Sequence, residues 1–223
     1  NFKKVLIYDP AFAPPGSNQA SEKYFEITVE IKYTAPDAPI VTTANGTTVT
    51  GTAEAGSTVT VYASDGTTVL GTATADATDG TYTVTLNPAQ SDGASITVTA
   101  TDADGNESTT ATTTVDATAP NAPVVSTANA DTVTGTAEAG STVTVYASNG
   151  TTVLGTATAD ATDGTYTVTL NPAQSDGASI TVTATDADGN ESTTATTTVD
   201  ATAPNAPVVS TANADTVTGT AEA

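Results

Sequence analysis

The residues of this chain that could do chemistry are aspartates, and they fall in short loops rich in glycine and asparagine. The clearest example is the run Asp186-Ala187-Asp188-Gly189-Asn190, in which alternate side chains carry oxygen ligands. Calcium takes six to eight such oxygens from carboxylates, amides, backbone carbonyls and water. The run is not an EF-hand loop, because its glycine comes fourth rather than sixth and no glutamate stands twelfth. Two interpretations stay open: a calcium site, or an ordinary hairpin turn whose acids are solvated.

Composition excludes most other chemistry. The chain has no His, Cys, Met, Trp or Arg, and its four lysines all lie in the first 34 residues. It therefore offers no imidazole or thiol for a catalytic triad, for a tetrahedral zinc site or for the ligation of haem. Hydrolysis by two carboxylates needs a pair held in a cleft, which small β domains rich in small side chains do not provide. We therefore predict that the chain is not an enzyme.

The charge of the chain excludes two classes of partner. The formal net charge is −21, and the sequence beyond residue 34 has no positive side chain. Such a surface repels nucleic acid and anionic membranes. No apolar run approaches the roughly 20 residues needed to span a bilayer. We predict neither nucleic-acid binding nor membrane insertion in this segment.

The chain is organised by an 84-residue repeat. Residues 36–119 and 120–203 differ only at positions 37, 40, 42, 46, 47 and 65, and residues 204–223 begin a third copy. A period of this length, built from Thr/Val-rich runs between turns, predicts a string of β domains. We expect a piece of a longer protein with four parts: a partial N-terminal segment (1–34), repeat 1 (35–118), repeat 2 (119–202) and the start of repeat 3 (203–223).

Each repeat predicts an all-β, seven-strand sandwich of the immunoglobulin-like kind. Apolar and polar residues alternate in short runs, and Asp-Gly pairs supply the turns between them. In repeat 1 the predicted strands are Pro39–Thr43, Thr47–Ala53, Ser57–Ala63, Thr67–Ala75, Thr81–Leu86, Ala94–Thr101 and Glu107–Val115. Up-and-down strand order then places three acidic loops at the pole where the preceding domain arrives. In repeat 1 these loops carry Glu54, Asp76, Asp79, Asp102 and Asp104, and in repeat 2 they carry Glu138, Asp160, Asp163, Asp186 and Asp188.

Acids gathered at a junction without cations should repel one another. A like-charge pair about 4 Å apart costs about 4 kcal/mol at an effective dielectric near 20. A calcium ion bound by Asp186, Asp188 and Asn190, with Asp116 reaching in from the linker, would remove that repulsion. Glu138 is a weaker addition from geometry. The linker has prolines at 120 and 123, which favour an extended path, so consecutive domains should form a rod.

The first 34 residues differ from the repeats. Residues 25–33 alternate as a strongly amphipathic strand, and Val5–Tyr8 is a second strand. Two strands cannot bury such a face alone. The segment is either the remnant of a preceding domain or a strand donated to a neighbouring subunit.

Four segments together carry a resemblance to a known family. They are residues 119–125 (APNAPVV), 133–145 (VTGTAEAGSTVTV), 184–192 (ATDADGNES) and 199–204 (VDATAP). In this order they resemble the bacterial Ig-like repeats of giant, type I-secreted, biofilm-associated surface adhesins. The resemblance covers residues 35–223 and leaves out 1–34.

The resemblance implies an extracellular stalk on the bacterial cell surface, which serves adhesion and biofilm formation and binds calcium at its domain junctions. The matching positions are Asp116 and Asp200 in the linkers, with Asp102, Asp104, Asp186 and Asp188 in the loops. The expected partners are neighbouring repeats and, in a biofilm or filament, copies of the protein itself. Two alternatives are a self-assembling filament that uses residues 1–34 for strand donation and Ig-like decoration of a phage virion. A lectin-like repeat ranks last, because exposed aromatic residues are few.

Overall fold

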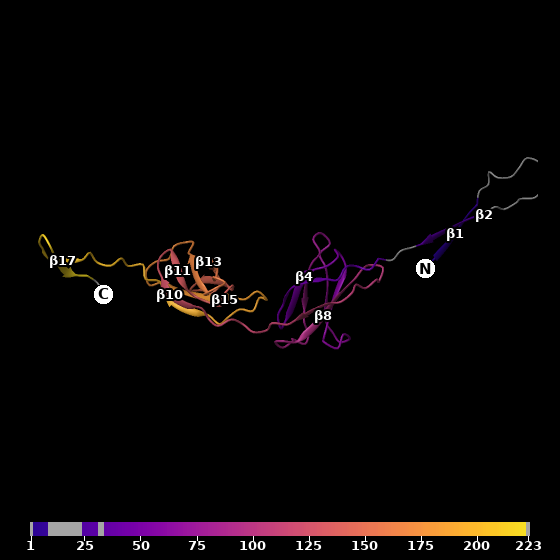
Figure 1. Ribbon diagram of the computed structural model, residues 1–223, viewed down its shortest axis with the longest axis horizontal. Coiled ribbons are helices and arrows are strands. Elements are labelled where there is room, and N and C mark those ends of the chain that lie inside the picture. The colour runs from indigo at the N-terminus through magenta and orange to yellow at the C-terminus, as the bar shows by residue number, and fades with distance from the viewer. Residues whose placement is uncertain (1, 9–23, 31–33, 222–223) are drawn as a thin grey trace, which may run out of the picture.

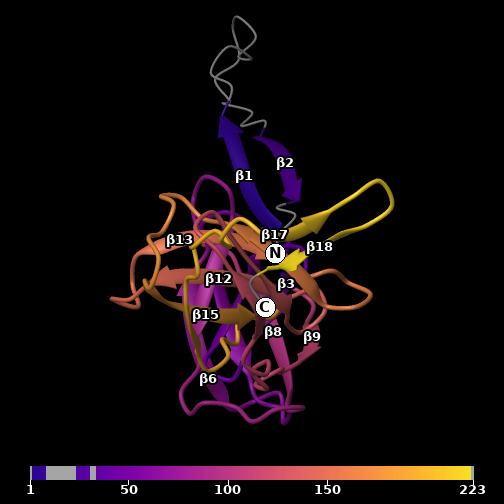
Figure 2. The same cartoon turned by 90° about the vertical axis from the view of Figure 1, so that its left-hand side faces the viewer.

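The computed structural model describes the backbone of residues 2–8 and 24–30 and all of residues 34–221. Figure 1 shows four parts that follow one another along the longest axis: a hairpin, two β-sandwiches and a second hairpin. Turned by 90°, the two sandwiches overlap in projection (Figure 2). The described residues contain no helix long and apolar enough to cross a membrane.

Repeat 1 is a sandwich of two antiparallel sheets, as the alternation predicted. The three-stranded sheet has the order β3 (Ile40–Ala44), β4 (Thr48–Thr52), β7 (Thr81–Thr85). The four-stranded sheet has the order β6 (Val69–Thr74), β5 (Thr58–Tyr62), β8 (Ser95–Thr101), β9 (Ala111–Thr114). All seven predicted strands are present, and the all-β sandwich is confirmed.

Two strands begin more than one residue later than predicted, in both cases because a side chain takes over backbone hydrogen bonding. The Asp65 carboxylate accepts the N–H groups of Thr67 and Thr68, which keeps this turn closed until β6 begins at Val69. The Ser108 hydroxyl accepts the Ala100 N–H at 2.9 Å, so that β9 begins only at Ala111. Such local side-chain bonds compete with the regular ladder.

Repeat 2 has the same two sheets. They are formed by β10 (Val124–Ala128), β11 (Thr132–Thr136) and β14 (Thr165–Thr169), and by β13 (Val153–Thr158), β12 (Thr142–Ala147), β15 (Ser179–Thr185) and β16 (Ala195–Thr198). After it, β17 (Val208–Ala212) and β18 (Val217–Thr220) form a hairpin. These two strands repeat the register of the first two strands of each sandwich.

The N-terminal segment forms an antiparallel hairpin of β1 (Phe2–Tyr8) and β2 (Tyr24–Glu30). Both predicted strands are present, and β1 starts three residues earlier than expected. The last part of the predicted amphipathic strand, residues 31–33, lies outside the described residues. Because β1 and β2 pair with each other, they do not by themselves decide between a domain remnant and a donor strand.

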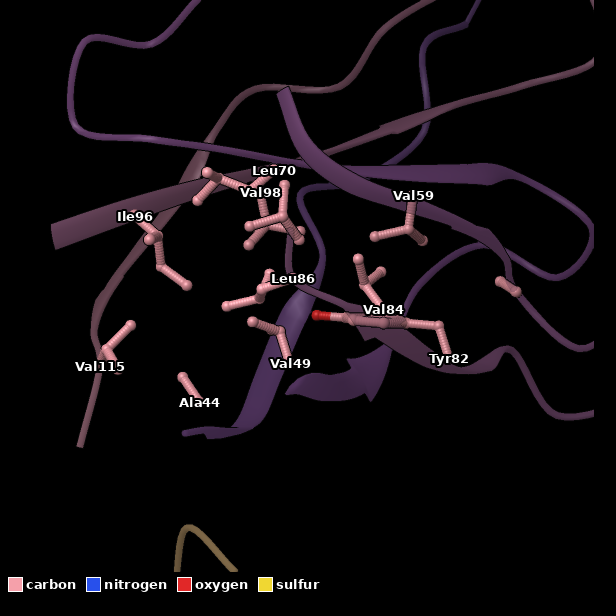
Figure 3. Packing of buried hydrophobic residues seen from close by; sticks show 12 residues of the cluster. Ala44, Val49, Val59, Leu70, Tyr82, Val84, Leu86, Ile96, Val98 and Val115 are labelled. Carbon is pink, nitrogen blue, oxygen red and sulfur yellow. The ribbon is translucent and has the colours of Figure 1, made fainter. Parts of the chain in front are cut away.

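Each sandwich has a small aliphatic core, which Figure 3 shows for repeat 1. Ile96, Val49, Val59 and Val84 are fully buried between the two sheets. Tyr82 lies beside them, and its hydroxyl donates a hydrogen bond to the Ile40 carbonyl at 3.2 Å. Burial raises the pKa of Tyr82 to about 12. This tyrosine is a packing residue rather than a ligand platform.

The strands of the repeats carry no charged side chain, and every acid lies in a loop or linker. Threonines occupy the outward positions of the strands, which suits faces exposed to water. Charge is therefore concentrated at the two poles of each sandwich, where the chain enters and leaves.

Candidate functional site: the junction between the repeats

The loop between β15 and β16 is organised by its first aspartate. Asp186 Oδ1 accepts the N–H groups of Asp188 and Asn190, both at 2.9 Å, and Asp186 Oδ2 accepts the Asn190 side-chain amide at 2.8 Å. Gly189 adopts a φ of 85°, in the left-handed region that favours glycine. The loop therefore holds its shape through its own hydrogen bonds.

Three hydrogen bonds join this loop to repeat 1. The Ala44 N–H donates to Asp188 Oδ1 at 2.8 Å, and the Asn45 side-chain amide donates to the Asp188 carbonyl at 3.1 Å. The Asn190 side-chain amide donates to the Asp116 carbonyl at 2.9 Å. Repeat 2 is thus bonded to two places at the end of repeat 1.

Those two places are themselves bonded together. The Asp116 N–H donates to the Ala44 carbonyl at 2.9 Å, so the exit of the chain from repeat 1 lies beside the end of β3. Asn45 Oδ1 accepts the N–H groups of Thr47 and Thr48 and shapes the turn between β3 and β4. The Asn45 Nδ2 group then faces the incoming loop. Each side of the junction is thus held in shape by hydrogen bonds of its own.

The junction also contains an open cleft of about 330 Å³. It is lined from repeat 1 by Asn45, Gly46, Thr47, Ala89 and Gln90, from the linker by Ala117, and from repeat 2 by Gly189 and Asn190. The contact between repeats is therefore polar and partly open rather than a closed apolar interface.

The predicted site residues separate into three groups. Asp188, Asn190 and the backbone carbonyl of Asp116 meet at the junction, and Asp186 shapes the loop. The Asp116 carboxylate, which was expected to reach into the site, instead accepts the Thr118 N–H in the linker at 3.0 Å. Asp102 and Asp104 occupy the equivalent loop of repeat 1, where the Asn106 amide and backbone N–H lower the pKa of Asp102. Glu138 and Asp200 are exposed. Glu138 lines a separate groove with Asn121 and Ala122, and Asp200 lies in the following linker.

Calcium at the junction stays a prediction. Within the described residues, no three carboxylates are grouped closely enough to hold a metal ion. Both oxygens of Asp186 and one oxygen of Asp188 already accept N–H donors. Calcium needs six to eight oxygen ligands, so the arrangement is not a ready-made cage for it.

Two features of the junction are not predicted by the sequence. The first is the backbone N–H of Ala44. It donates a hydrogen bond to the Asp188 carboxylate, for which the sequence predicted a calcium ion as the partner. The second is Asn45, whose side chain bonds both its own turn and the neighbouring repeat. An Asn-Gly pair such as 45–46 is typical of a tight turn, but nothing in the pair shows that another domain rests on it.

Comparison with known proteins agrees with this architecture. A family model described as a bacterial Ig domain matches residues 35–117 and 119–201. The chain belongs to the bacterial Ig domain family. A search of curated proteins found no match.

Several solved structures resemble the chain. A "Biofilm associated protein - BSP domain" is 29% identical with a TM-score of 0.35, and the match covers 75% of this chain and 30% of that one. The FN1-FN3 domains of chicken CNTN1 are 13% identical with a TM-score of 0.46, over 78% of this chain and 71% of that one. The fibronectin(III)-like modules of Clostridium thermocellum CbhA are 17% identical with a TM-score of 0.37, over 75% and 90%. The chain thus spans less than a third of the biofilm-associated protein structure that it matches.

Proposed function

We propose that this chain is a length of stalk from a bacterial cell-surface adhesin, with a mechanical rather than an enzymatic role. The observation that carries the proposal is the joint between the repeats, where a loop of repeat 2 is hydrogen-bonded to the turn and the exit strand of repeat 1. A tandem whose domains contact one another end to end gains length with every repeat.

The path of the chain supports this role. The chain enters repeat 1 near Ile40, at the start of β3, and leaves beside Ala44, at the end of the same strand. Each sandwich is therefore entered at one pole and left at the other. Figure 1 shows the two sandwiches following one another in this way. Membership of the bacterial Ig domain family and the near-identity of the repeats point the same way.

The site of action that we propose is the outside of the cell, in adhesion and biofilm formation. A neutral hydroxyl-lined side and acidic poles suit a solvated spacer that does not bind nucleic acid. An antibody raised against the repeats should label intact cells of the bacterium that makes the protein. Labelling only after the cells are permeabilised would contradict the surface role.

Calcium at the junction is the finer part of the proposal. Small-angle X-ray scattering of the whole chain should be recorded in about 5 mM calcium, above the affinities of roughly 10⁻⁴–10⁻³ M of extracellular modules, and again in excess EGTA. A long maximum dimension that shortens or blurs in EGTA supports a calcium-stiffened stalk. A long maximum dimension that is the same in both buffers contradicts the calcium part of the proposal and still supports the stalk. A short maximum dimension in both buffers contradicts the stalk itself.

A further inference from the structure

The two repeats differ at only six positions, and two of these lie in the turn on which the next repeat rests. Repeat 1 has Gly46 and Thr47 between β3 and β4, whereas repeat 2 has Ala130 and Asp131. Residues 46 and 47 both line the cleft that the loop of repeat 2 completes. The differences therefore change the surface that a repeat offers to its successor.

Position 46 has little room for a side chain. A Cβ atom built on Gly46 would lie 2.9 Å from the Gln90 carbonyl oxygen and 3.1 Å from the Cβ of Ala117 in the linker. The Gln90 N–H donates to the Gly46 carbonyl at 2.7 Å, which holds this part of the turn in place. An alanine here would have to displace the Gln90 backbone as well as the linker at Ala117.

Position 47 controls the charge that faces the loop of the next repeat. Thr47 is neutral and exposed, and it lines the cleft together with Gly189 and Asn190. An aspartate fits this turn without strain, because the Asp131 N–H bonds Asn129 Oδ1 as the Thr47 N–H bonds Asn45 Oδ1. Its carboxylate would nevertheless add a negative charge to the cleft that Gly189 and Asn190 line, beside the acidic loop 186–190 and in a part of the chain without positive side chains.

We propose that residues 46 and 47 determine how firmly a repeat holds the repeat that follows it. Gly46 and Thr47 let the loop 186–190 lie close to repeat 1, whereas alanine and aspartate at these positions weaken the joint through bulk and like-charge repulsion. The partner of this surface is the β15–β16 type of loop of a following copy of the domain. The inference rests on the proposed stalk. It adds that one molecule contains both firmer and weaker joints between its repeats.

Because the chain contains no cysteine, spin labels attach only at cysteines that are introduced for the test. Thr83→Cys and Thr167→Cys place one spin label on an exposed position of β7 and one on the equivalent position of β14. Pulsed electron paramagnetic resonance then gives the distribution of distances between the two repeats. In the otherwise unchanged chain this distribution should be narrow. Thr47→Asp should roughly double its width at low salt, and added salt should reverse most of that change by screening.

Two matched variants separate charge from other causes. Thr47→Asn has nearly the shape of the aspartate without its charge and should leave the distribution narrow. Asp131→Thr makes the opposite exchange in repeat 2, away from the measured joint, and should change nothing. Gly46→Ala should shift the mean distance with little effect of salt.

The inference is overturned if Thr47→Asp leaves the distribution narrow, if Thr47→Asn broadens it equally, or if the unchanged chain is already broad. These outcomes are separate from failure of the surface role. Loss of labelling on intact cells would overturn the stalk proposal while a salt-reversible effect of Thr47→Asp still stood.

Discussion

Residues 102–106 and 186–190 form the same loop in the two repeats, with the same sequence and different neighbours. In both copies the first aspartate accepts the N–H groups two and four residues later and the side chain of the asparagine. Asp104 is exposed, whereas Asp188 is half-buried and accepts the Ala44 N–H. Asn190 adds a bond to the Asp116 carbonyl that Asn106 lacks among the described residues.

The comparison teaches that the loop takes its shape before any neighbour docks on it. Asp102 makes these internal bonds although no described residue outside repeat 1 is bonded to its loop, so docking adds bonds without having to order the loop. A preorganised surface loses little conformational freedom on binding. The polar contact between the repeats can therefore hold an orientation although it buries little apolar surface.

The largest effects should come from the cores, where the two repeats are alike. Ile96→Ala and Ile180→Ala each remove a fully buried side chain, and each should cost its own repeat about 2–5 kcal/mol. Urea unfolding followed by NMR peak intensities can report the two repeats separately. The comparison requires nearly equal losses, each confined to the repeat that carries the substitution. A loss shared by both repeats would show that they unfold as one unit.

The docked and undocked loops should differ by a smaller amount. Asn106→Ala and Asn190→Ala both remove the bond to the organising aspartate, but only Asn190→Ala also removes the bond across the junction. A net hydrogen bond contributes about 0.5–1.5 kcal/mol, so the second variant should cost about 1 kcal/mol more. The same NMR-monitored urea unfolding measures both losses. Equal losses would mean that the junction bond contributes nothing in solution.

The smallest effect concerns a position where the repeats differ by one charge. Asp65 accepts hydrogen bonds from Thr68 and Thr67, and these bonds, led by the Thr68 hydroxyl, lower its pKa to about 2 from an ordinary value of 3.8. The resulting stability is present above pH 3.8 and is lost as the pH falls towards 2. Repeat 2 has Asn149 at this position, which does not titrate.

Acid unfolding of the chain and of Asp65→Asn can detect this difference. The unchanged repeat 1 should lose slightly more stability than repeat 2 between pH 4 and pH 2, and Asp65→Asn should bring the two repeats together. Because Asp65 is fully exposed, the change should be a small shift of the acid midpoint. If Asp65→Asn leaves the acid midpoint of repeat 1 unchanged, the loss of stability at low pH comes from other carboxylates.

Much of the fold followed from the sequence, because alternating Val and Thr between Asp-Gly turns leaves few alternatives to a β-sandwich. The errors occurred where a side chain replaces a backbone partner, as Ser108 does at the start of β9. The sequence also placed Asp116, Asp188 and Asn190 at one junction, through the order of the strands. It did not reveal their partners, because Ala44 donates through a backbone N–H group and Asp116 accepts through a backbone carbonyl, and nearly every residue carries both groups.

The central claim is that the loop 186–190 holds repeat 2 in one orientation on repeat 1. Residual dipolar couplings of the backbone amides of both repeats, measured on the whole chain in one alignment medium, test it most directly. The docked junction predicts that couplings from residues 36–115 and 120–199 fit a single alignment tensor, and that Asp188→Ala separates them while Asp104→Ala does not. Two unequal tensors in the unchanged chain would show that the repeats turn independently, and would contradict the claim.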